Sequence, residues 1–89
     1  MKTKIVRVPW PQGLHLLPAA TIVRAAQRFR SSIHVRVGSR MSEATSILGL
    51  VVLCATLNTE VRIEIQGEDE REALHAVAAC FESDPSTRP

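Results

Sequence analysis

Residues 13–20 read GLHLLPAA and mark the point where an extended segment gives way to a helix. The preceding residues 9–13, PWPQG, cannot continue a strand, because the two prolines lack amide donors and the glycine permits a turn. Pro18 fits a helix only in the first turn, where the amide it lacks would have no partner. The helix is therefore predicted to begin close to His15. Apolar residues then recur at helical spacing and predict a helix over residues 16–29 with one buried face: Ala19, Ile22, Val23, Ala26 and Phe29.

Four short segments on either side of this helix have the pattern of strands. Residues 3–8, TKIVRV, are rich in β-branched side chains, and residues 32–37 and 60–66 alternate between apolar and polar side chains. Gly38 and Ser39 predict a turn into a short strand over residues 40–43. Asn58 tolerates a left-handed conformation and is expected to end the connection that precedes the last strand. Trp10 either lies partly exposed beside His15 or packs over the edge of the core, and we favour packing.

Two further helices are predicted. Ser46 precedes ILGLVVLCA, a brief segment that is apolar on nearly all sides and is either deeply buried or partly a docking surface. Asp69 is placed to cap a final helix, and Glu72 follows three residues later, as in a capping box. His75 and Cys80 are expected to lie off the inner face of this helix, which is formed by Ala73, Leu74, Val77, Ala78 and Phe81.

The predicted order is strand, helix, strand, strand, helix, strand, helix. Amphipathic strands with one polar face predict an α+β fold, a two-layer open-faced sandwich with a four-stranded antiparallel sheet covered on one face by three helices. The length of 89 residues suits a single domain spanning residues 1–89, in which the polar, proline-containing residues 83–89 are expected to fray. We expect a monomer.

Composition narrows the range of functions. The net charge of +2 and the 3% of aromatic residues argue against nucleic-acid binding, and the arginines at positions 24, 28, 30, 36 and 40 are spread over several elements. No apolar run has the length of a signal peptide or a membrane span, so the expected location is the cytoplasm, without membrane association. Cys54 and Cys80 form no metal-ligand pattern with the histidines, and we expect reduced thiols, no metal and no cofactor.

His15 is the leading candidate for chemistry because of its position. It precedes a helix whose free amides and dipole favour an anion, so a phosphoryl group on the imidazole could be held there. The alternative is that His15 only begins the helix and has no reactive role. Its position alone does not decide between the two.

The chain as a whole resembles the histidine-containing phosphocarrier protein family, HPr. The GLHLLPAA segment is similar to the family pattern Gly-(Leu/Ile)-His-x-Arg-Pro-Ala. The resemblance continues through AAQRFRSSIHV, TSILGLVVL and GEDEREAL, at spacings like those of the family and over nearly the whole chain. The family implies phosphoryl transfer from enzyme I, which is charged by phosphoenolpyruvate, to the IIA components of the sugar phosphotransferase system.

The resemblance also implies roles for particular residues. His15 would be the phosphoacceptor, and Leu16 and Leu17 would contribute main-chain amides to hold the phosphoryl group. Ser46 matches the serine that an HPr kinase/phosphorylase modifies in some relatives, although it could equally be only the N-cap of the second helix. The expected docking surface for enzyme I and IIA comprises Leu17, Arg24, Gln27, Ile47, Leu48 and Val51.

The chain departs from the family pattern at two positions. Leu17 replaces an arginine, which would neutralise phosphoryl charge, so we expect His15 to transfer phosphoryl groups with reduced efficiency. Cys54 stands where a glycine is common, and we expect it to alter packing only. The alternative function is a regulatory HPr-like binding module that transfers no phosphoryl group and acts through Ser46 and the apolar residues around Ile47.

Overall fold

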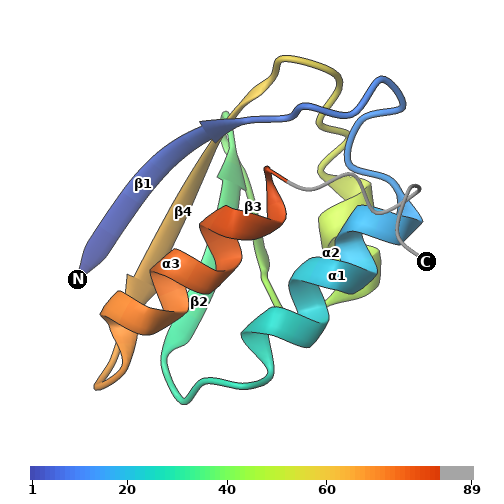
Figure 1. The fold of residues 1–89 in the computed structure, drawn as a ribbon. Coiled ribbons are helices and arrows are strands. Elements are labelled where there is room, and N and C mark those ends of the chain that lie inside the picture. The colour runs from blue at the N-terminus through green and yellow to red at the C-terminus, as the bar shows by residue number, and fades with distance from the viewer. Residues whose placement is uncertain (83–89) are drawn as a thin grey trace.

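A computed structural model describes residues 1–82 and confirms the predicted order of elements (Figure 1). The expectation that residues 83–89 fray lies outside the described residues. The elements are β1 (Lys2–Arg7), α1 (Leu16–Ala26), β2 (Ser32–Val37), β3 (Arg40–Glu43), α2 (Ile47–Val52), β4 (Glu60–Gln66) and α3 (Glu70–Cys80).

The four strands form one antiparallel sheet in the order β1-β4-β2-β3. In the central pair, Ile33 lies opposite Ile65 and Val35 lies opposite Ile63, and all four of these side chains are buried. The three helices lie on the same side of the sheet, as Figure 1 shows, while the other face carries the polar residues of the alternating pattern. The predicted open-faced sandwich is therefore correct.

Several boundaries differ from the prediction: β1 begins at Lys2 and ends at Arg7, α1 ends at Ala26, and α2 ends at Val52 rather than Ala55. Val8 lies beyond β1, although its amide donates to the Thr59 carbonyl at 3.0 Å and its carbonyl accepts from the Asn58 amide at 2.8 Å. Helix α1 ends at Ala26 rather than Phe29, because Gln27 is the C-cap and Phe29 donates to a carbonyl three residues back, as in a tight final turn. Phe29 is consequently only half-buried.

Trp10 belongs to the core. Its side chain is 4% exposed and its ring centroid lies 5.4 Å from that of Phe81, at the end of α3. Partial exposure beside His15 is therefore wrong, and packing over the core is confirmed. The contact closes the end of the core that the loop after β1 would otherwise leave open.

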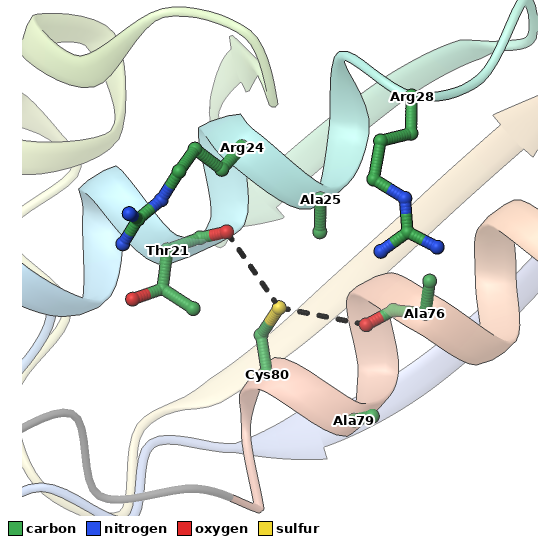
Figure 2. Close-up of a pocket in the computed structure, with 7 residues that line it drawn as sticks. All are labelled: Thr21, Arg24, Ala25, Arg28, Ala76, Ala79 and Cys80. Carbon is green, nitrogen blue, oxygen red and sulfur yellow. Dashed lines mark hydrogen bonds between the residues drawn. The ribbon is translucent and has the colours of Figure 1, made fainter. Parts of the chain in front are cut away.

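Cys80 is also buried, contrary to the prediction that it lies off the inner face of the last helix. Its side chain is 8% exposed, and the thiol lies 3.4 Å from the Ala76 carbonyl and 3.9 Å from the Thr21 carbonyl of α1 (Figure 2). Helix α1 covers this side of α3, so burial extends beyond the side that faces the sheet. His75 is exposed, as predicted.

Asp69 precedes α3, but the predicted capping box does not form, because its carboxylate makes no hydrogen bond within the helix. Instead, the carboxylate accepts the amides of Arg30 and Ser31 at 3.0 Å each, together with the Ser31 hydroxyl. Glu70, rather than Glu72, reaches back and accepts the Gly67 amide at 3.1 Å. Asp69 thus ties the start of α3 to the loop between α1 and β2.

Asp69 should contribute to stability in a pH-dependent way. Hydrogen bonds from the Ser31 hydroxyl and the Arg30 amide lower the pKa of its carboxyl below the ordinary value. The folded state therefore binds fewer protons than the unfolded state. The contribution is present above the unfolded pKa of about 3.9 and is lost as the pH falls through the folded pKa.

Thermal unfolding of Asp69→Ala should show a Tm several degrees below that of the unsubstituted protein at pH 7, with the difference shrinking below about pH 3. The matched control is Glu68→Ala, because no hydrogen bond or ion pair of the neighbouring Glu68 is found among residues 1–82. Equal Tm losses for the two variants at pH 7 would contradict the assigned role of Asp69.

Candidate functional site

The loop that carries His15 is fixed by a close contact with the segment that follows α2. Gly13 has a φ of +77°, and a Cβ at this position would lie 2.5 Å from the Ala55 carbonyl oxygen, so only glycine fits. The next amide, that of Leu14, donates to the same oxygen at 2.8 Å. This contact sets the direction in which the chain enters α1.

His15 is the N-cap residue of α1. Its backbone is extended, its carbonyl accepts the Ala19 amide at 3.0 Å, and its half-buried side chain makes no capping hydrogen bond. The amides of Leu16 and Leu17 have no acceptor among residues 1–82. The imidazole therefore stands beside two free donors at the positive end of a helix dipole.

This arrangement suits a negatively charged group on His15. Helix α1 carries no acidic side chain in its first turn, so nothing in that turn competes for the two amides. A neutral imidazole nitrogen can act as a nucleophile, and a phosphoryl group attached to it would carry charge at a point where backbone donors favour an anion.

Exposed aliphatic side chains surround this end of the molecule. On α1, Leu16 and Leu17 are 61% and 52% exposed, and on α2, Leu48 and Val52 are 75% and 65% exposed. The two helices pack against each other, and we call these four exposed residues together the apolar patch.

The expected docking residues are divided by the structure. Leu17, Arg24, Gln27 and Leu48 are exposed, whereas Ile47 and Val51 are half-buried and pack against the core. Val52 was not singled out from the sequence. Val52 is four residues from Leu48, so the two lie on the same face of α2, and this spacing could have indicated its exposure. The helix is apolar on nearly all sides, however, so its sequence does not show which face points outward.

Ser46 is the N-cap of α2, and its hydroxyl oxygen accepts the Gly49 amide at 3.0 Å. The side chain is exposed, so the hydroxyl remains accessible. Capping gives Ser46 a structural role that is independent of any modification.

A hollow lies between α1 and α3, with a volume of about 570 Å³ (Figure 2). It is lined by Thr21, Arg24, Ala25, Arg28, Ala76, Ala79 and Cys80, and so includes neither His15 nor Ser46. Of the expected docking residues it contains only Arg24.

No helix in the described part of the chain is long and apolar enough to cross a membrane.

Cys54 lies just beyond α2 with a φ of +57°, in the left-handed region that glycine adopts without penalty. The thiol is exposed and free. The expected effect on packing is therefore wrong, because the departure acts on the backbone conformation. Asn58, at a φ of +69°, is left-handed as predicted.

Replacing Cys54 should separate these two effects. Cys54→Gly should exceed Cys54→Ala in free energy of unfolding by about 0.5–1 kcal/mol, because alanine keeps a Cβ in the left-handed conformation. Urea denaturation measures the difference. If the alanine variant were as stable as the glycine variant, the left-handed backbone would not be what disfavours a side chain here.

Comparison with known proteins identifies a family. The family model described as the PTS HPr component phosphorylation site matches residues 2–83. The HPr-like protein Crh of Bacillus subtilis is 39% identical over 79 residues, which are 89% of this chain and 93% of that protein. The phosphocarrier protein HPr of Treponema pallidum is 37% identical over 83 residues, covering 93% of this chain and 94% of that protein.

Comparison with solved structures points to the same family. The crystal structure of an HPr from Thermoanaerobacter tengcongensis superposes with a TM-score of 0.90 at 31% identity, covering 100% of both chains. The crystal structure of Bacillus subtilis Crh gives a TM-score of 0.74 at 39% identity, covering 92% of this chain and 94% of that one, and is described as a swapped, intertwined dimer.

Proposed function

The chain belongs to the HPr family of phosphocarrier proteins, and we propose that it relays a phosphoryl group on His15 from enzyme I to IIA components in the cytoplasm. The observation that carries the proposal is the placement of His15 at the N-cap of α1, beside the free amides of Leu16 and Leu17. These amides hold the phosphoryl oxygens. The apolar patch, with Arg24 and Gln27 beyond it on α1, docks the two partner proteins.

Leu17 lowers the efficiency of this relay wherever no other cation takes the place of the missing arginine. A guanidinium at this position would make charge-assisted hydrogen bonds to the phosphoryl group, each worth about 1.5–3 kcal/mol. Leucine keeps the backbone amide and removes the charge. If one such bond acts in the transition state, the rate falls by roughly one to two orders of magnitude.

Incubation with phosphoenolpyruvate and an enzyme I that serves an arginine-bearing HPr tests the proposal. We expect slow formation of an acid-labile phosphoryl adduct, no adduct on His15→Ala, and formation roughly 10–100 times faster on Leu17→Arg. The lability of the adduct identifies phosphohistidine, and mass spectrometry locates it.

A second candidate function is regulation without transfer. It is favoured by the similarity to the HPr-like protein Crh and by the exposed hydroxyl of Ser46. If the unsubstituted protein formed no adduct with the enzyme I of an arginine-bearing HPr or with the enzyme I encoded in the same genome, while Leu17→Arg formed one, the carrier function would be abandoned in favour of this alternative.

Ser46 is tested with an HPr kinase/phosphorylase, which is expected to add an acid-stable phosphate. Ser46→Asn and Ser46→Ala should both abolish the label, but only the alanine variant should lose about 1 kcal/mol of stability, because asparagine also caps a helix. An undiminished label on Ser46→Asn would remove Ser46 from the regulatory proposal.

We further propose that the carrier acts as a monomer. Within a single chain, β1 pairs with β4 at six consecutive positions, so β4 needs no strand from a second copy. The swapped dimer described for Crh is the alternative, and size-exclusion chromatography distinguishes the two states.

A further inference from the structure

The end of the molecule around His15 is built from two segments without formal charge. Residues 8–23 and residues 44–59 contain no Lys, Arg, Asp or Glu. The segments meet through the hydrogen bond from the Leu14 amide to the Ala55 carbonyl and through the packing of α1 against α2. We call this region the uncharged pole, and it includes His15, Ser46 and the apolar patch.

Two arginines at the margin of the uncharged pole are each engaged by a backbone carbonyl of residues 44–59. Arg7 donates to the Asn58 carbonyl at 3.0 Å and pairs with Glu60 at 3.7 Å. Arg40 donates to the Val52 carbonyl at the end of α2, at 3.5 Å.

Arg24 is the first charged residue after His15 and lines the hollow between α1 and α3 beside Thr21 (Figure 2). About 10 Å of helix axis separates it from Leu17. The remaining arginine of the C-terminal segment, Arg88, lies outside the described residues.

Phosphoryl transfer requires more positive charge than this pole provides. The two free amides and the helix dipole amount to roughly half an elementary charge, whereas the transferred group carries more than one negative charge. When a partner covers the apolar patch and excludes water, an uncompensated charge becomes more costly. Enzymes that move phosphoryl groups place a cation at the transferring group, either within the chain or from a second protein.

We propose that the partner supplies this cation: an arginine or lysine on an otherwise apolar docking face, seated over Leu17 when the phosphoryl group is exchanged. The inference rests on the proposed function and defines the kind of partner that fits. Leu17 leaves space and an apolar surface for the incoming side chain. An arginine at position 17 would repel it, so this chain and its partner would form a matched pair.

Docking affinity tests the cation directly. Leu17→Glu, Leu17→Gln and Leu17→Arg are compared for binding to the enzyme I encoded in the same genome. Position 17 is exposed, so all three variants should fold. We expect Leu17→Glu to bind about tenfold tighter than Leu17→Arg at low salt, with the affinity of Leu17→Gln between the two. At high salt the three affinities should become similar, because salt screens the charges.

The control is the same set of changes at Leu57, which is exposed, lies within the uncharged pole and is outside the apolar patch. It measures the effect of the overall charge of enzyme I. The differences in affinity found at Leu57 are subtracted from those found at position 17. If the Leu17→Arg variant then bound as tightly as the Leu17→Glu variant, the proposal would be overturned.

Transfer rates give an independent readout. Leu17→Arg should accelerate transfer from an enzyme I that serves arginine-bearing HPr proteins by roughly 10–100-fold, but change transfer from the enzyme I of the same genome by less than about threefold. Equal acceleration with both donors would show that the partner brings no cation. Slower transfer from the same-genome enzyme I to Arg88→Gln would place the cation within this chain and overturn the proposal.

The two proposals can fail separately. If neither donor phosphorylated His15, the carrier function would fall, while the order of docking affinities at position 17 would still report whether a partner cation faces Leu17. If His15 were phosphorylated but the affinities followed apolarity alone, the carrier function would stand without the cation supplied by the partner.

Discussion

The close approach of Gly13 to Ala55 determines how the functional end of the molecule is assembled. A hydrogen at the Cα of residue 13 lets the loop after β1 lie directly against the segment after α2, and the Leu14 amide then bonds to the Ala55 carbonyl. Any larger side chain would have to displace backbone, which cannot shift without moving β4. Through this one contact, residues far apart in the sequence place the start of α1 and the whole of α2 at the same end of the core.

Local patterns were sufficient wherever a segment has one buried face. The alternation in residues 32–37 and 60–66 predicted β2 and β4 with the observed bounds, because a strand with one buried face allows only one orientation. The predictions failed where a residue had a choice of partners. Asp69 was expected to cap its own helix, but the loop after α1 offers three donors that become available only in the folded chain. Cys80 is buried by α1, which is not adjacent to it in sequence.

The candidate site was predictable to a similar extent. The glycine, histidine and proline of residues 13–18 indicated a helix start with free amides, and that start is where the structure has it. The absence of charge in residues 8–23 and 44–59 can also be read from the sequence. That the two stretches meet around His15 cannot be read there, because it depends on the loop contact and on helix packing. The left-handed backbone of Cys54 was missed, although the glycine that is common at this position in the family was an available signal of it.

The uncharged pole has a consequence for recognition. An empty carrier of this kind offers a partner no formal charge beside His15, and Arg24 is the first charged residue that follows it along α1. Encounter then depends mainly on diffusion and on the fit of apolar surfaces. Under the proposed function, loading His15 introduces the first formal charge within residues 8–23 and 44–59. Loading therefore changes the sign of the first charge along α1, from the positive charge of Arg24 to the negative charge of the phosphoryl group. A partner with a single well-placed cation could distinguish donor from spent carrier by that charge alone, without any change in the fold.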